Sequence, residues 1–517
     1  MDEGTRASSG AQPPDRDPKG DGTPWSALRS GVAGLIRTGG LRLAFASNFT
    51  SHALAVLASL ATFRLMIVLT DMPTTGLWAM ILGFAVTAGV AEMGLGLNLI
   101  RFVAAHESPS RRLLLRLSAV GAIMCMIPAA LLGLLAAWPI YWFAVTRPDL
   151  PVSASAVAVL TVSALAVTFV NTAISIFSGL AEGLGRVALR SAAMLLYNVV
   201  TLALIWPALW LFGPVGIGLA NLAGVSTQLG LVVAVLLVTA RKLPRTADDA
   251  TVSSLLRTLL GSTMQNFGIV LARLTFDPVA RFYVALGGSL TVQAWFELAV
   301  RVSNQVRQVV QVSLQPLVFI GASDHASMAE RFERPHSITV RLSATMLLSL
   351  ACISPLISAV VLGQIVPGFI IYLLIMGVGG AVYMIGVSGQ NALAALGRFD
   401  VLLKLWVFAA ALNVALGGLA LLAGGGPFAG AGGLAAAFAI TGILLARQHA
   451  RIAARSLRSR FDGLWPLLVM GTATGAGLAL AAARLPVTTV VALSAASCLL
   501  LIVPGWRLGR MFLRRDI

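Results

Sequence analysis

The chain has 517 residues, of which 58% are hydrophobic and 11% are charged. A soluble protein carries about 25% charged residues, so this composition excludes an ordinary soluble protein. Apolar runs of roughly 20 residues recur along the chain, and each is long enough to cross a bilayer as a helix. The runs are too uniformly apolar for barrel strands, so we expect an all-α polytopic membrane protein.

Net charge and cysteine use narrow the class further. The formal net charge of +17 could indicate nucleic-acid binding, but the Lys and Arg residues lie in alternate predicted loops. Orientation in a membrane requires that alternation, so we expect a lipid bilayer and no nucleic acid among the partners. Cys125, Cys352 and Cys498 lie within apolar runs, where they offer neither a disulfide framework nor a metal site.

The N-terminal segment differs from the rest of the chain. Residues 1–24 are rich in Pro, Gly and Asp and have almost no large apolar residues, which predicts a disordered tail. From Trp25 to Arg42, apolar residues at helical spacing alternate with arginines, as in a short interfacial helix or a simple lead-in to the first span. We assign residues 1–42 to a cytoplasmic tail, because the first apolar run begins too late for a cleaved signal peptide.

Fourteen membrane-spanning helices are predicted after this tail. With the N-terminus in the cytoplasm, 30 of the 37 Lys and Arg residues fall in inward tails and loops, and outward loops hold only Arg147, Arg281 and Arg484. This bias follows the positive-inside rule, and an even number of spans places both termini on the cytoplasmic side of the inner or plasma membrane. The predicted spans lie near 43–69, 77–100, 114–138, 154–178, 190–212, 215–239, 253–276, 290–319, 342–363, 367–389, 402–424, 428–446, 465–483 and 487–506.

A weak internal repeat relates two parts of the chain. LGR triplets at 184–186 and 396–398 are 212 residues apart, and Gly-Pro turns at 213 and 426 are 213 apart. Two matches at nearly one offset predict two six-helix bundles related by a pseudo-two-fold axis, a standard transporter plan. The bundles would cover 43–239 and 253–446, and residues 447–517 would add two further helices and a cytoplasmic tail.

The predicted span at 290–319 carries a polar stripe. At ~100° per residue its members fall within an arc of about 80°. Facing lipid would be unfavourable, because even one Arg near the bilayer centre costs about 2.5–3.5 kcal/mol on insertion scales. The stripe therefore faces the protein interior, either as a polar zipper between packed helices or as a wall of a hydrated cavity. Its members are Gln293, Glu297, Arg301, Asn304, Gln308, Gln311 and Gln315, with Arg307 beside them.

The residue types in the stripe favour a cavity for a polar solute. Gln and Asn amides offer both donors and an acceptor to sugar hydroxyls, and the planar fork of Arg suits phosphate. Glu297 and Arg301 are four residues apart with the acid first, which favours a helix ion pair. The chain has no P-loop and no metal-protease motif. We expect a transporter rather than an enzyme, with no catalytic residue, metal or cofactor.

Four other charged residues lie in predicted spans near the stripe. Arg273 and Asp277 share one face of the span at 253–276, where Arg273 either faces the cavity or reaches the outer interface. Asp277 precedes a proline, so it either serves the cavity or ends the helix. Arg64 in the first span has the same two options as Arg273. Glu92 in the second span is either a structural hydrogen-bonding group or a charge partner for a cavity arginine.

Two segments of the chain carry motifs of a known family. The segment "GLWAMILGFAVTAGVAEMGLGLNLIRFVA" at 76–104 is similar to the second-span signature of polysaccharide and O-antigen flippases, which belong to the multidrug/oligosaccharidyl-lipid/polysaccharide exporter superfamily. The segment at 277–319, with its aromatic-Glu-Leu-Ala-x-Arg core and a proline near the helix end, is similar to the seventh-to-eighth span region. Trp295-Phe296 stands where the family typically has Tyr, and the likeness covers most of residues 43–446.

The resemblance implies a specific activity. Family members move an undecaprenyl-pyrophosphate-linked glycan from the cytoplasmic to the periplasmic leaflet of the inner membrane, through a cavity that opens alternately to each side. We then expect Arg301 to bind the pyrophosphate, assisted by Arg64, Arg273 or Arg307. The stripe amides would contact the sugars, and a polysaccharide polymerase or glycosyltransferases would be partners.

Three other functions stay open at this point. A peptidoglycan-precursor flippase would belong to the same superfamily. A drug or metabolite cation antiporter would depend on an isolated carboxylate, for which Glu92 and Glu297 are candidates. A membrane enzyme of glycan assembly would need more outward-facing chain than the short predicted loops supply.

Overall fold

The computed structural model describes most of the chain between Gly40 and Leu499. Outside the described residues lie 1–39, 88–94, 105–109, 185, 187, 245–251, 323–335, 397, 453–463, 500–517 and, within 337–348, all but Ser343, Thr345 and Leu347. All regular structure in the described part is helical, which agrees with the predicted all-α class.

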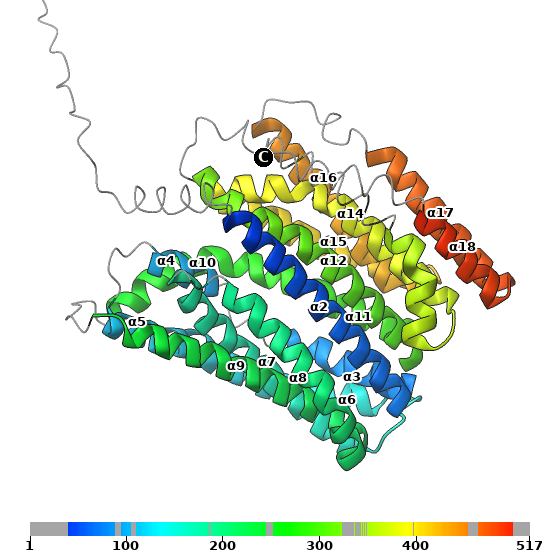
Figure 1. Ribbon diagram of the computed structural model, residues 1–517, viewed down its shortest axis with the longest axis horizontal. Coiled ribbons are helices and arrows are strands. Elements are labelled where there is room, and N and C mark those ends of the chain that lie inside the picture. The colour runs from blue at the N-terminus through cyan, green and yellow to red at the C-terminus, as the bar shows by residue number, and fades with distance from the viewer. Residues whose placement is uncertain are drawn as a thin grey trace, which may run out of the picture.

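The described helices of the N-terminal part pack into one group, here called the first half (Figure 1). Within it α8 packs along α9 and α2, and α7 packs along α9 and α4. Its helices are α2 (Gly40–Leu69), α3 (Met72–Ala85), α4 (Leu95–Ala104), α5 (Arg111–Gly121), the π-helix η2 (Ala122–Met126), α6 (Ile127–Val145), α7 (Ala154–Gly183), α8 (Ala188–Phe212), the 3-10 turn η3 (Gly213–Val215) and α9 (Gly216–Arg241).

The second half follows from residue 252. Here α14 packs closely against α16 and α12, and α15 packs against α16 and α10. The pair α17 and α18 lies at the far edge of the molecule, where α17 contacts α14 (Figure 1). The helices are α10 (Val252–Leu274), α11 (Phe276–Gly287), α12 (Leu290–Ala322), the π-helix η4 (Ser358–Leu362), α14 (Pro367–Ala395), α15 (Phe399–Leu422), α16 (Phe428–Ile452), α17 (Leu464–Arg484) and α18 (Val487–Leu499).

Six helical stretches of the described residues are long and apolar enough to cross a membrane. Shorter apolar helices accompany them, including Met72–Ala85 and Ser349–Leu362. This is the pattern of a polytopic membrane protein. The count of fourteen spans stays a prediction, as do the bundle boundaries. The six stretches are Arg111–Val145, Ala154–Gly183, Leu189–Arg241, Pro367–Ala394, Phe399–Leu422 and Phe428–Ile452.

The two predicted repeat turns share local geometry. The backbone N–H of Arg186 donates to the carbonyl of Ala181 at 3.0 Å, and that of Arg398 donates to the carbonyl of Leu393 at 2.9 Å. Both bonds span five residues, the pattern that closes a helix before the chain reverses. The turns at Gly213 and Gly426 also match, with φ values of +59° and +52°. The pseudo-two-fold relation of whole bundles stays a prediction.

One short helix was not expected. Residues 276–287 form α11, although the sequence predicted an outward loop there. The prediction that Arg281 lies in that loop is wrong, because Arg281 is buried within α11 with 8% of its surface exposed. A helix of 12 residues is too short to identify as a span by its apolar length. Its burial depends on contacts with α3, α12, α15 and α16.

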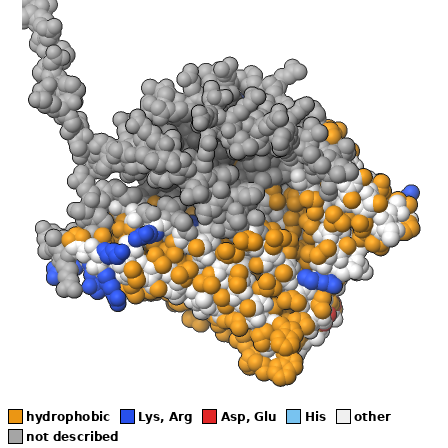
Figure 2. Space-filling model, viewed as in Figure 1, with side chains coloured by type: hydrophobic (Ala, Val, Ile, Leu, Met, Phe, Trp, Pro, Cys, Tyr) orange, Lys and Arg blue, Asp and Glu red, His pale blue; other side chains and the backbone are white. Residues whose placement is uncertain are grey.

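The two halves meet closely where α3 packs against α12. A Cβ at Gly76 would lie 1.8 Å from the carbonyl oxygen of Leu290, so only glycine allows this approach. On the outside, apolar side chains cover much of the described surface, while Lys and Arg gather mainly at one end (Figure 2). Trp142 and Trp210, at the ends of α6 and α8, are 58% and 77% exposed, as expected of residues at a membrane interface.

Candidate functional site

A small polar cavity lies between the halves, next to Arg301 of α12. It measures about 270 Å³ when space open to solvent is counted, and in this conformation it has room for about one water molecule. The guanidinium of Arg301 donates to Ser59 Oγ of α2 at 3.2 Å and lies 5.4 Å from the centre of the Phe63 ring. Among the described residues, the cavity lining contains no carboxylate. The lining is Ser59, Thr62, Met66, Trp78, Tyr197, Asn198, Thr201, Asn221 and Arg301.

Hydrogen bonds hold the neutral side chains of this Arg301 cavity in place. Tyr197 Oη donates to Asn221 Oδ1 at 3.0 Å, while Asn221 Nδ2 donates to the carbonyl of Ile217 at 2.9 Å. Asn198 Nδ2 donates to the carbonyl of Met194 at 2.8 Å. Such bonds fix the amide orientations before any ligand arrives, which lowers the ordering cost of binding.

Glu297 lies behind Arg301 and has two arginine partners. Arg281 Nε and Nη2 donate to Glu297 Oε2 at 3.0 and 2.9 Å. Arg301 Nη2 lies 3.8 Å from Glu297 Oε1, which confirms the predicted ion pair between these residues. The sequence interpretation missed Arg281, the closer partner, because that residue was placed in a loop. Its spacing of four from Asp277 was the available signal for a helix.

A glycine of the first half makes room for Arg281. A Cβ at Gly83 of α3 would lie 2.1 Å from Arg281 Cδ and 2.5 Å from its Nε. Arg281 and Glu297 are 8% and 7% exposed. Removing two charges this far from water is costly unless their geometry is good. The close packing over Gly83 therefore supports the ion pair on which the position of Arg301 depends.

A second group of arginines lies on aromatic rings inside the second half. Arg273 Cζ lies 5.0 Å from the centre of the Trp406 ring, and Arg307 Cζ lies 4.4 Å from that of Phe438. Phe276 contacts both rings, at 5.7 Å from Trp406 and 5.2 Å from Phe438. Cations over aromatic faces are stabilised by the ring quadrupole. We call this group the arginine–aromatic cluster.

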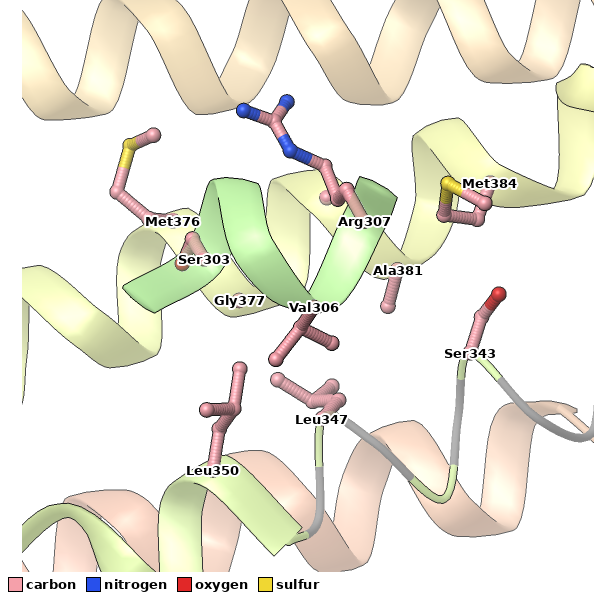
Figure 3. Close-up of a pocket in the computed structure, with 11 residues that line it drawn as sticks. Ser303, Val306, Arg307, Ser343, Leu347, Leu350, Met376, Gly377, Ala381 and Met384 are labelled. Atoms are coloured by element: carbon pink, nitrogen blue, oxygen red, sulfur yellow. The ribbon is translucent and has the colours of Figure 1, made fainter. Parts of the chain in front are cut away.

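The surroundings of Arg307 are mixed. Its side chain also donates to Asn304 Oδ1 of the same helix. The negative charge of Asp277 attracts the guanidinium from beyond ion-pair distance. A hollow of about 300 Å³, which includes space open to solvent, lies beside the stem of Arg307. In Figure 3 the guanidinium points away from Val306 and Leu347, which line the apolar side of that hollow.

The other predicted site residues fall in several places. Arg64 lines neither cavity, because its Nη1 donates to the carbonyl of Val361 at 3.3 Å. Gln293 is fully buried, and its amide atoms have no hydrogen-bond partner among the described residues. This end of the stripe is therefore packed, whereas the Arg301 end borders a cavity. Glu92 and the side chains of Gln308, Gln311 and Gln315 lie outside the described residues.

Comparison with known proteins found matches in structure but none in sequence. No family model matches the chain, and no curated protein matches it in sequence. Solved structures do match. The lipid II flippase MurJ in an inward closed conformation aligns with a TM-score of 0.62 and 12% identity, over 91% of this chain and 100% of that one.

Two MATE structures extend the likeness. An outward-facing multidrug resistance MATE family transporter of the MOP superfamily aligns with a TM-score of 0.53 and 14% identity, over 81% of this chain and 96% of that one. A variant of the Vibrio cholerae MATE transporter VcmN aligns with 0.55 and 14%, over 83% and 99%. The chain has the same fold as these transporters. MOP denotes the multidrug/oligosaccharidyl-lipid/polysaccharide superfamily to which the sequence showed a resemblance, and the solved structures support that resemblance at the level of the fold.

Proposed function

We propose that this chain is a MOP-type flippase that moves an undecaprenyl-pyrophosphate-linked oligosaccharide from the cytoplasmic to the periplasmic leaflet for polysaccharide synthesis. The headgroup would occupy the space between the halves, and the polyprenyl tail would stay in lipid. The two halves would rock to expose the headgroup to each side in turn. Glycosyltransferases would supply the substrate, and a polysaccharide polymerase would consume it.

The Arg301 cavity is the observation that carries this proposal. A guanidinium is a suitable phosphate ligand, and hydroxyl and amide groups are suitable sugar ligands. Arg301 comes from the second half, whereas Ser59, Tyr197 and Asn198 come from the first. A phosphorylated headgroup bound here would therefore touch both halves and respond to their separation.

The arginine–aromatic cluster supports an anionic substrate. Among the described residues, neither Arg273 nor Arg307 has a carboxylate within 4.0 Å. A cation inside a membrane protein is costly without a nearby negative charge. We infer that a second oxyanion of the headgroup is bound near these two side chains during transport.

The same geometry weighs against a cation antiporter that depends on Glu297. Such a protein would depend on a carboxylate available to a proton, a metal ion or a cationic drug. Glu297 instead contacts Arg281 at 2.9 Å and Arg301 at 3.8 Å, so its charge is compensated within the protein.

The second candidate is a flippase for a peptidoglycan precursor. The alignment with the lipid II flippase MurJ favours it, because that structure aligns over 91% of this chain. Both candidates share a lipid pyrophosphate, so the Arg301 cavity fits either one. The two differ in the sugar and in the consequence of loss, since a peptidoglycan-precursor flippase would be essential for growth.

A deletion in the native host tests the proposal. Loss of the chain should leave growth intact and make the lipid-linked glycan accumulate in the inner leaflet. Expression of the Arg301→Ala variant in the deletion strain should not relieve the accumulation. Expression of the Arg190→Ala variant, which changes a largely exposed arginine of α8, should relieve it. Lethal deletion would favour the peptidoglycan-precursor reading. Glycan that reached the outer leaflet but stayed unpolymerised would contradict a flippase role.

A further inference from the structure

Two residues of the first half hold the turn between α11 and α12 of the second half. Arg147 Nη2 donates to the carbonyl of Gly288 at 2.8 Å, and its Nη1 donates to the carbonyl of Ala285. Asp149 Oδ2 accepts from the backbone N–H of Leu290 at 2.5 Å. The two side chains also pair with each other at 3.3 Å.

The order of the charges matches the helix ends that they contact. The last carbonyls of a helix lack partners and carry partial negative charge, while the first amides carry partial positive charge. Arg147 lies at the C-terminal end of α11, and Asp149 lies at the N-terminal end of α12. Each side chain thus satisfies a group that its own charge complements, so we call this arrangement the Arg147–Asp149 clamp.

A second arginine of the first half also contacts a helix end of the second half. Arg64 of α2 donates to the carbonyl of Val361, in the last turn of the helix that ends at Leu362. The next residue, Gly363, has a φ of +79°, and a Cβ there would lie 2.7 Å from Arg64 Nη1. Glycine is therefore required both for the turn and for the approach of the guanidinium.

We propose that the Arg147–Asp149 clamp and Arg64 form a releasable latch, which holds the two halves together in this conformation and opens when they separate. The proposal goes beyond the transported substrate, because it concerns the equilibrium between conformations. Three groups of the first half contact backbone atoms at helix ends of the second half. No contact of the latch requires a particular side chain on the second half, except the absence of one at Gly363.

The position of the latch explains why it can open. The side chains of Arg147 and Asp149 are 12% and 31% exposed, so the clamp borders solvent, although the paired atoms Arg147 Nε and Asp149 Oδ1 are buried. Once the halves separate, water can bond to the released carbonyls and amide as well as to the two charges. The contact of Gly76 with the Leu290 carbonyl differs from the clamp, because it depends on close backbone packing and not on charged side chains.

Spin-label distances on the full chain in lipid nanodiscs test the latch. Labels would be placed at Ala154→Cys in the first half and Gln364→Cys in the second, both exposed, after Cys125, Cys352 and Cys498 are replaced by Ser. Arg147→Ala should raise the ratio of separated to closed molecules roughly five- to tenfold, as expected for losing a charged hydrogen bond at a helix end. Arg64→Ala should act in the same direction. Arg484→Ala, which removes an exposed arginine at the end of α17, should change nothing.

The charge swap Arg147→Asp with Asp149→Arg separates the latch from an ordinary ion pair. The swap keeps the attraction between the two side chains but places each beside the wrong helix end. The latch predicts that the swapped protein remains as separated as Arg147→Ala, while Arg147→Lys gives a smaller shift. Restoration of the closed distance by the swap, or an unchanged distance in Arg147→Ala, would overturn the proposal. These distances need no substrate, so they can fail independently of the proposed flippase activity.

Discussion

Arg301 and Arg307 lie on one helix, six residues apart, yet they serve different regions. Six residues correspond to a rise of about 9 Å and a rotation of roughly 240°. Arg301 reaches across to the neutral hydroxyl and amide groups of the first half. Arg307 points into its own half and lies on Phe438. One polar helix in a membrane protein can therefore supply both a site between the halves and a cation bound within one half.

The two regions also differ in how their charges are supported. Arg301 has Glu297 close by, and Glu297 is held by Arg281. Among the described residues, Arg307 contacts the amide of Asn304 and an aromatic ring, and the charge of Asp277 acts on it from beyond ion-pair distance. The first arrangement fixes a guanidinium at the edge of a cavity, whereas the second leaves positive charge that an anion can compensate. Four substitutions test this difference between the two regions.

The largest effect is expected from Arg281→Ala. This change leaves the carboxylate of Glu297 buried with only Arg301 at 3.8 Å. Breaking a buried ion pair from one side costs about 3–5 kcal/mol. The thermal inactivation midpoint of the purified protein should fall accordingly, and Arg281→Met with Glu297→Leu should recover much of the loss. Equal destabilisation by the single and double variants would contradict the role of Glu297 as the stranded charge.

Gly83→Leu should come next. The new side chain would occupy the space of Arg281 Cδ, which lies 2.1 Å from the site of a Cβ at Gly83. Overpacking of this kind costs about 1–3 kcal/mol. Transport should fall as well, because Arg281 orients Glu297 beside Arg301. Gly477→Leu on α17, where a Cβ would meet nothing within 4 Å, is the matched control and should leave both readouts unchanged.

Arg307→Gln tests the arginine–aromatic cluster. The amide keeps a polar group but loses the charge and the stacking on Phe438. A hydrogen bond to a charged group is worth about 1.5–3 kcal/mol, so losing the one that Arg307 would make to an anionic headgroup should weaken binding by roughly tenfold or more. Binding of the lipid-linked substrate to the purified protein measures this change, and Arg307→Lys should keep part of the affinity. Unchanged affinity in Arg307→Gln would remove the cluster from the substrate path.

Gln293→Leu should have the smallest effect and the opposite sign. The amide of Gln293 is fully buried without a hydrogen-bond partner among the described residues. Replacing an unsatisfied buried polar group by an apolar one of similar size can be neutral or stabilising by about 1 kcal/mol. The thermal inactivation midpoint should therefore stay or rise. A clear drop would show that the packed end of the stripe is hydrated like the Arg301 end.

The sequence predicted the helical class and much of the helix order, because apolar length and turn residues act locally. The closed turns at Arg186 and Arg398 follow from short motifs in the same way. The burial of Arg281 could not be predicted, since the space for its side chain depends on a glycine in α3 that is distant along the chain.

The site was partly predictable for a similar physical reason. The period of α12 placed Glu297 and Arg301 on one face, and their ion pair is present in the structure. That period could not show that Gln293 is packed, that Arg301 borders a cavity or that Arg307 lies on Phe438. Each of these depends on which helices of the fold cover α12 at that level. For Arg64, the sequence allowed a cavity role or an interfacial one, and the structure adds a contact with a helix end of the second half.

Translocation by the purified protein in liposomes tests whether Arg301 binds the phosphate of the substrate between the two halves. A fluorescent undecaprenyl-pyrophosphate-linked oligosaccharide in the inner leaflet would be followed by its accessibility to an added quencher. We predict that the native chain and Arg190→Gln move it, while Arg301→Gln stops movement and weakens binding. Movement by Arg301→Gln at the native rate, with native affinity, would contradict a phosphate-binding role for this arginine between the two halves.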